Sequence, residues 1–388
     1  GDQGVEHVVL ERGEVANSWR KERWDSLTLL TPNWQTRLPG CAYDGNDPDG
    51  YMSVSELVQF LDDYATNTAA PIVTGCEVTS LRRIGERYHL TTSQGAWSAR
   101  AVVLATGACN VPSVPKAAGD LPAEITQLTP FDYHSPASVP DGGTLIVGAA
   151  APGLQLAHEL LNAGRDVTIA AGEHVRMPRR YRGKDIFYWM TQSGIHDEIY
   201  TDVEDIVRGR RLPSPQLVGH SDLPILDLNY LQDQGARIAG RFTRVWNGQL
   251  QFSGSLGNVC ALADLKMQRL LKLIDETADR EAAPAADTFA PTRVDDDPLL
   301  SLDTGNIRSV IWATGFRPDY SWLDVDVLDR KGNLRHEGGV VDSEGLYVLG
   351  LPLMRRRKSS FIFGIEDDAR DIADHLVGYL TTRLRRAS

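Results

Sequence analysis

The chain has 388 residues, of which 42% are hydrophobic and 24% are charged, and its formal net charge is −12. This length suits two or three domains, and the composition is that of a globular protein. The acidic balance disfavours a nucleic-acid partner and an anionic membrane surface.

The cysteines exclude one class of redox site. Cys41, Cys76, Cys109 and Cys260 stand far apart and form neither a C-x-x-C pair nor a zinc-type pattern. A dithiol relay needs two sulfurs close together, so a thioredoxin-reductase-like relay is disfavoured. We expect reduced thiols in a cytoplasmic protein and no metal site. No apolar run approaches the ~20 residues of a membrane span.

An acidic residue closes the first apolar run, residues 7–13 (HVVLERG). A dinucleotide-binding unit uses such an acid, here Glu11, to hold a ribose hydroxyl, and its Gly-rich phosphate loop lies roughly 20 residues earlier. Counting back places that loop before Gly1. The sequence therefore predicts a nucleotide-binding domain that is incomplete at its N-terminal side.

Short elements follow in chain order. Residues 55–65 have helical spacing with Ser53 or Ser55 as the cap, and strands are expected near 78–81 and 88–92. Residues 101–105 (AVVLA) are continuous and apolar, as in a buried parallel strand. Prolines and glycines between residues 112 and 143 then indicate a linker.

A second unit opens at Thr144. A strand over 144–147, a turn over 148–153, a helix over 154–162 and a strand over 166–170 fit within one βαβ unit. The turn is a G-x-G-x-x-G loop with Ala150 in place of the middle glycine. Gly148 and Gly153 are expected to bring backbone N–H groups and a helix N-terminus against a pyrophosphate. A structural turn without a ligand is the alternative.

The strand over 166–170 ends without the acid that would hold a bare ribose hydroxyl. Arg176, Arg179 and Arg180 follow shortly after it. An arginine beside this strand end suits a 2′-phosphate through bidentate pairing, so NADPH is favoured over NADH. A solvated basic loop is the alternative, and Glu173 is an unfavourable neighbour for a phosphate.

The rest of the chain returns to strands after a helix. Residues 250–280 become helical, with an apolar stripe formed by Leu262, Leu265, Leu270, Leu271 and Ile274. The following stretch to residue 297 is rich in Ala, Pro and Asp and predicts a mobile connection. Strands are expected over 310–313 and 346–349, and a final helix over 367–384. Between them, residues 355–358 (RRRK) indicate either a phosphate or acidic-substrate contact or a solvated basic loop.

Two turns repeat the same small motif. Ala105-Thr106-Gly107 and Ala313-Thr314-Gly315 each follow a buried strand. Glycine in such a turn lets the backbone come close to a ligand or to a crossing chain.

Further motifs occur together along the chain: Ser18-Trp19-Arg20, Arg23-Trp24-Asp25-Ser26-Leu27, Thr31-Pro32, Leu38-Pro39-Gly40, Gly315-Phe316-Arg317-Pro318-Asp319 and Gly345-Leu346-Tyr347-Val348-Leu349-Gly350. With Glu11 and the two Ala-Thr-Gly turns, they make the chain resemble the flavin-dependent monooxygenases of the flavin-containing (class B) type over essentially its whole length. One motif departs from that family: F-x-G-x-x-x-H-x-x-x-Y would fall on residues 123–133, and only Tyr133 is kept.

The resemblance implies an α/β fold with two Rossmann-like, three-layer dinucleotide-binding domains. The FAD-binding domain would be discontinuous, formed by residues 1–112 and 305–388, and incomplete at its N-terminal side. Residues 140–300 would form the NADPH-binding domain.

The resemblance also implies roles for residues. Glu11 would bind the adenosine ribose of FAD, and Trp19, Arg20 and Trp24 would pack around its pyrophosphate and ring, ordinary core aromatics being the alternative for the two tryptophans. The remaining cofactor-binding positions would be Val78 at the adenine, Ala105, Thr106 and Gly107 at the phosphates, Ala313, Thr314 and Gly315 in the second turn, and Gly350 and Asp367 beside the flavin ring. Asn33 is the candidate catalytic residue.

By this resemblance NADPH reduces FAD, O₂ adds to the flavin, and the hydroperoxide oxygenates a small organic substrate. Two alternatives are open: a flavin reductase or oxidase without oxygen insertion, and a truncated NADP-binding chain with impaired FAD binding and no turnover. The expected partners are the substrate and O₂, and a homodimer is a possible assembly.

Overall fold

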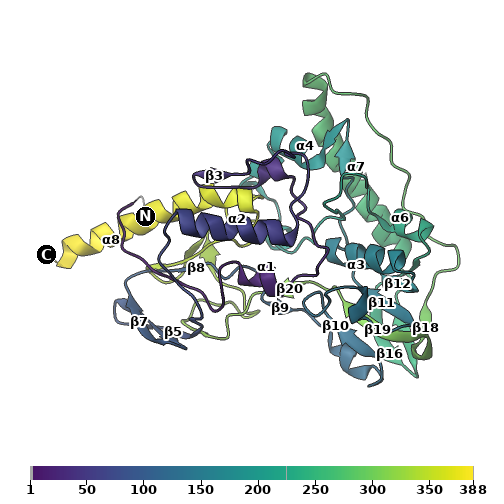
Figure 1. Cartoon of the computed structure of the whole chain (residues 1–388), viewed down its shortest axis with the longest axis horizontal. Helices are drawn as coiled ribbons and strands as arrows, with labels where there is room; N and C mark the ends of the chain where they lie inside the picture. Colours follow the sequence, from purple (N-terminus) through teal and green to yellow (C-terminus); the bar gives the residue numbers. More distant parts are fainter. Residues whose placement is uncertain (1–2, 224, 388) are drawn as a thin grey trace.

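The computed structural model describes residues 3–223 and 225–387. Figure 1 shows two lobes: the N- and C-terminal segments (purple and yellow) form one, and the middle of the chain (teal and green) forms the other. The first lobe therefore combines segments far apart in sequence. Near the N-terminus, Gln3 Nε2 donates to Asp374 Oδ1 of the final helix at 3.0 Å.

The first lobe divides its parallel strands between two sheets. The smaller sheet pairs β1 (Val9–Leu10) with β4 (Ile72–Val73). The larger sheet has the order β22–β23–β24–β8, with bounds His336–Glu337, Val340–Val341, Leu346–Val348 and Val102–Leu104. Because β24 pairs with β8 in parallel, the two ends of the chain share one sheet, as predicted for a discontinuous domain. Val9 and Val103 on these strands are 43% and 39% exposed.

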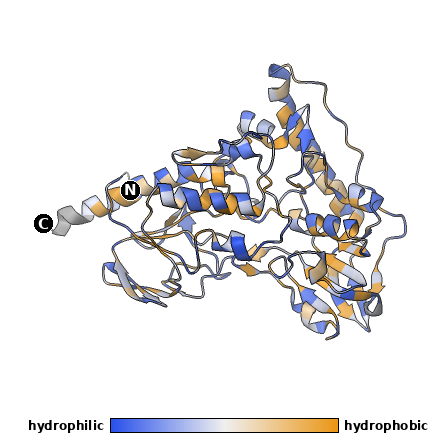
Figure 2. Cartoon of the chain, in the orientation of Figure 1, coloured by the Kyte–Doolittle hydropathy of each residue, from blue (hydrophilic) through white to orange (hydrophobic). Residues whose placement is uncertain are grey.

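Helices and a meander surround these sheets. The meander is β5 (Val78–Ile84), β6 (Arg87–Thr92) and β7 (Gly95–Ala99), with β21 (Leu323–Asp324) at its edge. The other elements are α1 (Asn17–Lys21), β2 (Arg37–Leu38), β3 (Cys41–Ala42), α2 (Val54–Asn67) and α8 (Ile365–Ala387). Ser53 caps α2 in a capping box with Glu56, as the sequence predicts. Figure 2 shows polar and apolar residues side by side along α2, which buries only one face.

The second lobe is built on one five-stranded parallel sheet. Its order is β10–β19–β11–β12–β15, with bounds Thr126–Leu128, Ile307–Trp312, Gly143–Val147, Val167–Ala170 and Arg237–Ala239. Every residue of β11 and β12 is buried, and α3 (Ala151–Asn162) connects them. The predicted βαβ unit is therefore confirmed.

This sheet corrects two predicted boundaries. β10 lies within the segment predicted as a linker, and β19 lies within residues 305–388, which were assigned to the first domain. The chain thus re-enters the first lobe only after Trp312, where β20 (Phe316–Arg317) pairs with β9 (Val111–Pro112) between the lobes.

Helices and short strands complete the second lobe. They are β13 (Arg180–Tyr181), β14 (Lys184–Asp185), α4 (Ile186–Gln192), α5 (Ile206–Gly209), α6 (Leu228–Asp233), β16 (Phe242–Trp246), β17 (Gln249–Phe252), α7 (Leu256–Arg280) and β18 (Ser301–Asp303). Among the described residues, no helix is long and apolar enough to span a bilayer.

The long helix α7 differs from its predicted stripe. Leu271 and Ile274 are buried as expected, whereas Leu262 and Leu265 are exposed. The buried face consists instead of Cys260, Ala263, Met267, Leu271 and Ile274. The segment after α7, predicted as a mobile connection, is held in place: the Ala290 carbonyl accepts from Arg176 Nη1 at 2.8 Å, and Thr292 N donates to Asp264 Oδ2 at 2.8 Å.

Candidate functional site at the junction of the lobes

Two backbone segments, 195–200 of the second lobe and 355–358 of the first, join the lobes in a ladder of hydrogen bonds. Lys358 N donates to His196 O at 3.1 Å, Arg357 N to Glu198 O at 3.0 Å, and Tyr200 N to Arg355 O at 2.9 Å. The basic segment 355–358 is therefore neither a free loop nor a bare anion site. It is one edge of a ladder between the lobes.

Ion pairs reinforce this ladder. Lys358 Nζ lies 2.7 Å from Asp197 Oδ1 of the second lobe and 2.7 Å from Asp367 Oδ2 of the first. The lysine lowers the pKa of the Asp367 carboxyl. Arg357 pairs with Glu198 in the same way across the junction. These pairs hold the start of α8 against residues 195–197 (η4, Ile195–Asp197).

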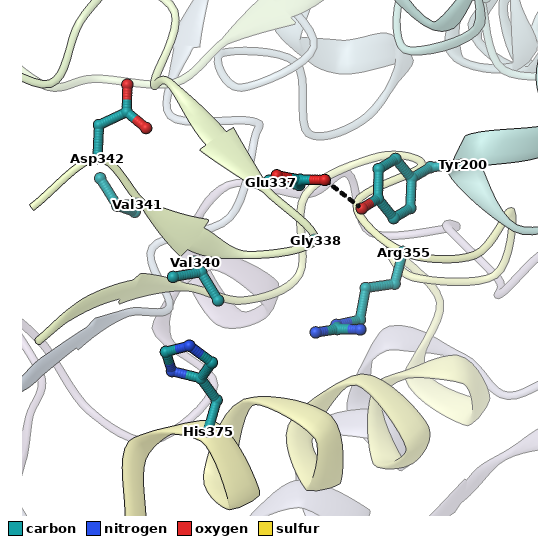
Figure 3. A pocket seen from close by; sticks show the side chains of 8 residues that line it. All are labelled: Tyr200, Glu337, Gly338, Val340, Val341, Asp342, Arg355 and His375. Atoms are coloured by element: carbon teal, nitrogen blue, oxygen red, sulfur yellow. Dashed lines mark hydrogen bonds between the residues drawn. The ribbon is translucent and has the colours of Figure 1, made fainter. Parts of the chain in front are cut away.

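A cavity of about 370 Å³ lies at one end of the ladder. Figure 3 shows its lining, in which the Tyr200 hydroxyl points to Glu337 and donates at 3.5 Å. Its other charged groups are already engaged: Arg355 lies 3.4 Å from Asp371, and Asp342 lies 3.1 Å from Arg335. The lining therefore offers little unpaired charge to a ligand.

A buried polar chain crosses the junction. Gln35 Nε2 donates to Thr191 Oγ1 at 3.2 Å, and the Thr191 hydroxyl donates its only hydrogen to Phe187 O at 2.9 Å. Thr191 Oγ1 must therefore accept from His196 Nδ1, which lies 2.9 Å away. This contact fixes the tautomer of His196: Nδ1 carries the hydrogen and Nε2 presents a lone pair.

His196 is a neutral, enclosed acceptor. Its side chain is 1% exposed, and burial lowers its pKa to about 4. The rings of Phe187 and Phe363 lie 5.4 and 5.2 Å from the imidazole, which accounts for the apolar surroundings. Nε2 has no hydrogen-bond partner within residues 3–223 and 225–387.

Two side-chain oxygens of η1 (Asn33–Gln35) are also buried acceptors without a donor in the described chain. Asn33 Nδ2 donates to Asp47 O at 2.9 Å, which leaves its Oδ1 buried and unpartnered in the described chain. Gln35 Oε1 is likewise buried without a donor there. A buried acceptor without a donor costs about 1–3 kcal/mol. The junction therefore suits a ligand that presents N–H or O–H groups.

Comparisons with known proteins agree with this architecture. Residues 2–193 match the family described as pyridine nucleotide-disulphide oxidoreductase. An oxidoreductase of the CzcO-like type from Geobacillus kaustophilus is 30% identical over 377 residues, 96% of this chain and 91% of that protein. The chain belongs to the CzcO-like oxidoreductases.

Solved structures place the CzcO-like chain in a known fold. A flavin-containing monooxygenase from Stenotrophomonas maltophilia matches with a TM-score of 0.63 and 18% identity, covering 96% of this chain and 98% of the other. The bacillithiol disulfide reductase of Bacillus cereus matches at 0.59 and 13%, with 97% and 93% covered. OTEMO in complex with FAD and NADP matches at 0.57 and 12%, with 98% and 82% covered. The predicted two-domain flavoprotein fold and family are confirmed, and FAD and NADPH are supported as the cofactors.

Three glycines, in the first lobe and in the segments that cross between the lobes, have backbone conformations that allow a ligand to come close. Gly107, Gly315 and Gly350 have φ of 72°, 88° and 82°, a region that favours glycine. A Cβ at Gly107 or Gly315 would meet no atom within 4 Å. The backbone in both Ala-Thr-Gly turns therefore borders open space, as expected where a nucleotide passes. Ala105 and Thr106 are exposed, whereas Ala313 is buried and Thr314 Oγ1 donates to Ser113 O at 2.6 Å.

The remaining first-lobe candidates lie either at strand ends or in side-chain packing contacts. Glu11 Oε1 accepts from Gly13 N at 2.8 Å at the end of β1, and Val78 opens β5. Arg20 pairs with Asp62 of α2, and Trp19 lies under the Arg23 guanidinium at 5.0 Å. Trp24 is 6% exposed and lies in the core of the second lobe, which agrees with the alternative that it is an ordinary core aromatic.

The phosphate turn of the second lobe is fixed by backbone packing. A Cβ on Gly148 would lie 2.2 Å from Ala313 O, and one on Gly153 would lie 2.1 Å from Gly148 O. α3 begins at Ala151, and its N-cap residue Ala150 supplies no side-chain acceptor for the first N–H groups. This helix end is suited to a pyrophosphate.

Two of the arginines predicted for a 2′-phosphate do not fit that role. Arg176 is 3% exposed and lies 2.6 Å from Asp227 and 2.7 Å from Asp264. Arg179 is 1% exposed and lies 2.7 Å from Asp185. Both guanidinium groups are already engaged by buried carboxylates. Only Arg180 of the three is exposed, on β13.

Sequence reasoning missed an arginine in the expected place. Arg241 follows β15, and its Nε lies 3.8 Å from where a Cβ on Gly172 would be, just past the end of β12. It is exposed and has no ion-pair partner in the described part of the chain. The signal that would have found it is its position after β15, the strand that pairs with β12 in the same parallel sheet.

Proposed function

We propose that this CzcO-like oxidoreductase is an NADPH- and FAD-dependent monooxygenase that inserts one oxygen atom of O₂ into a small organic substrate. The observation that carries the proposal is the junction itself. It holds buried acceptors, aromatic walls and a neutral histidine, where the two nucleotide-binding lobes meet. Water exclusion of this kind suits oxygen insertion, because water would otherwise divert the reaction.

The chain's own residues would share the work as follows. FAD, when bound, supplies hydride acceptance and O₂ activation. Glu11 and the Gly107 turn would hold it, while Gln35 and His196 accept hydrogen bonds from N–H or O–H groups at the junction. The α3 N-terminus and Arg241 would hold the pyrophosphate and 2′-phosphate of NADPH.

A flavin reductase or oxidase is the second candidate. The pyridine nucleotide-disulphide family match and the likeness to a bacillithiol disulfide reductase favour it. The thiols do not: all four cysteines are free, Cys76 and Cys260 are buried, and burial raises the pKa of Cys260 to about 11. These two are therefore poor nucleophiles toward a disulfide.

Stoichiometry on the flavin-loaded chain tests the proposal. NADPH oxidation, O₂ consumption, hydrogen peroxide and oxygenated product would be measured together across a substrate panel. We expect O₂ uptake with product in place of peroxide for at least one substrate. One peroxide per NADPH with every substrate would favour the second candidate. A visible spectrum without bound flavin after incubation with FAD would favour a chain that binds NADP alone.

A further inference from the structure

A second, larger cavity is lined by Ile195 of η4, the residue before His196. It measures about 600 Å³ and is bounded by α4 and η4, by residues 203–212 and by α7. This volume is within the range of small-molecule sites.

The lining of this cavity is predominantly apolar. Met177, Met190 and Met267 contribute three of the five methionines of the chain, and Leu270 and Leu273 add further apolar surface. Methionine side chains are flexible and polarisable, so they adapt to apolar ligands of different shape. At the rim, Leu273 is 49% exposed.

Most of the charged groups around the cavity are engaged by a partner. Lys266 and Arg208 lie 2.9 and 3.6 Å from Glu173, and Arg357 pairs with Glu198. Arg176 is engaged by Asp227 and Asp264 behind the wall. Asp205 caps α5 by accepting from Arg208 N at 2.9 Å. An occupant therefore meets mainly apolar surface, and the Asp205 carboxylate is the lining charge without an ion-pair partner in the described residues, which disfavours an anionic ligand.

The cavity also borders the junction of the lobes. Arg357, which belongs to the ladder, is part of its lining. Residues 203–212 pack on the first lobe, where Arg210 Nε donates to Leu353 O at 3.4 Å and a Cβ on Gly209 would lie 2.8 Å from Leu353 Cδ2. Ile195 of the short η4 turn lines the cavity, and the next residue of that turn is the buried His196.

We propose that this cavity binds the substrate and selects uncharged, apolar small molecules. Binding of an apolar molecule in this cavity does not depend on the proposed function. The identification of that molecule as the substrate rests on the proposed function. For a thioether, the balanced reaction would be thioether + O₂ + NADPH + H⁺ giving sulfoxide + NADP⁺ + H₂O, with the sulfur oxidised and NADPH supplying two electrons.

Equilibrium dialysis of the holoenzyme tests the binding step. The probes are N-phenyl-1-naphthylamine and 8-anilinonaphthalene-1-sulfonate, which share a ring system and differ in charge. We expect one neutral probe per chain, bound at least about tenfold more tightly than the sulfonate. Equal affinity for the two probes would overturn the proposal.

Two variants of α7 locate the site. Leu273→Glu places a carboxylate at the rim and is expected to weaken the neutral probe by about tenfold. Leu262→Glu is the matched control, because Leu262 is 43% exposed on the same helix and does not line the cavity. Equal losses in both variants, or no loss in either, would contradict the assignment.

Turnover separates this proposal from the proposed function. Thioanisole and 4-(methylthio)benzoate carry the same reacting sulfur and differ in charge. The proposal expects sulfoxide from thioanisole and at least about tenfold less from the carboxylate. Equal oxygenation would overturn the selectivity while keeping the monooxygenase. Oxygenation of neither, with tight neutral-probe binding, would instead count against the monooxygenase and keep the binding site.

Discussion

The two lobes hold their nucleotide-binding turns in different ways. In the second lobe, five parallel strands form one sheet, and the Gly148 turn is packed against Ala313 of the next strand. In the first lobe, β1 and β8 have two and three residues and belong to different sheets, and Val9 and Val103 on them are exposed. Its site segments are held by loop hydrogen bonds and ion pairs. Continuous sheet therefore positions the Gly148 turn of the second lobe, and polar contacts position the site segments of the first lobe.

The largest expected effect is on the packed turn. Gly148→Ala would place a Cβ 2.2 Å from Ala313 O at a φ of 121°. We expect a loss of about 4 kcal/mol or more in the free energy of unfolding, measured by urea denaturation. Gly119→Ala is the control, because a Cβ there meets no atom within 4 Å. Similar losses in both variants would show that close packing does not fix this turn.

The buried ion pairs of the second lobe come next. Arg176→Met leaves Asp227 and Asp264 buried without their cation, which costs about 3–5 kcal/mol of unfolding free energy. Arg237→Met removes a partner of Asp166 from an exposed pair at 3.4 Å and should cost about 0–1 kcal/mol. A small loss for Arg176→Met would mean that the network is dispensable.

The buried His196 at the junction predicts that the free energy of unfolding depends on pH, with an effect smaller than that of Arg176→Met. Burial lowers the pKa of folded His196 from 6.5 to about 4, so the unfolded chain takes up the proton first as pH falls. This contribution to stability is complete above about pH 6.5 and is lost as pH falls towards about pH 4. Between about pH 7 and pH 5 the loss is about 2 kcal/mol.

His196→Gln keeps a polar side chain without this titration and should reduce the loss between those two pH values. His336 also has a pKa lowered by burial to about 4 and keeps its own contribution in both chains, which provides the comparison. Parallel stability curves for the two chains would contradict a neutral, buried His196.

The smallest effect is on coenzyme choice. Arg241→Ala should raise the KM for NADPH by about tenfold and leave that for NADH unchanged, because only NADPH carries the 2′-phosphate. Arg244→Ala is the control, since Arg244 lies nearby on β16 and is engaged by Gln251 at 2.8 Å. Equal changes for both coenzymes would exclude Arg241 from this role.

Local patterns in the sequence predict the second lobe well. The strands at 144–147 and 166–170 are mainly apolar because both of their faces are buried, and Gly148 and Gly153 between them are required by backbone packing. β10 was hidden because a three-residue edge strand, Thr126–Leu128, has no such run. A strand of this kind is defined by its partner and hardly by its own residues.

The site was less predictable, because its residues depend on partners far away in sequence. Arg176 reads as a solvated loop residue, yet its two carboxylates lie 51 and 88 positions away. Asn33 stays a prediction from the sequence. No local pattern singles out the nearby Gln35, because its partner Thr191 is 156 positions away. The tautomer of His196 follows only from that same threonine.

The β9–β20 pair has a mechanical consequence. Both passages of the chain between the lobes run through it, antiparallel and hydrogen-bonded, with Ser113 N donating to Gly315 O at 2.9 Å. Because the two passages are hydrogen-bonded to each other, a displacement of one is resisted by the other. The ladder at 195–200 and 355–358 is a separate backbone connection between the lobes, so breaking it would expose the enclosed His196 to solvent while the two passages stay joined.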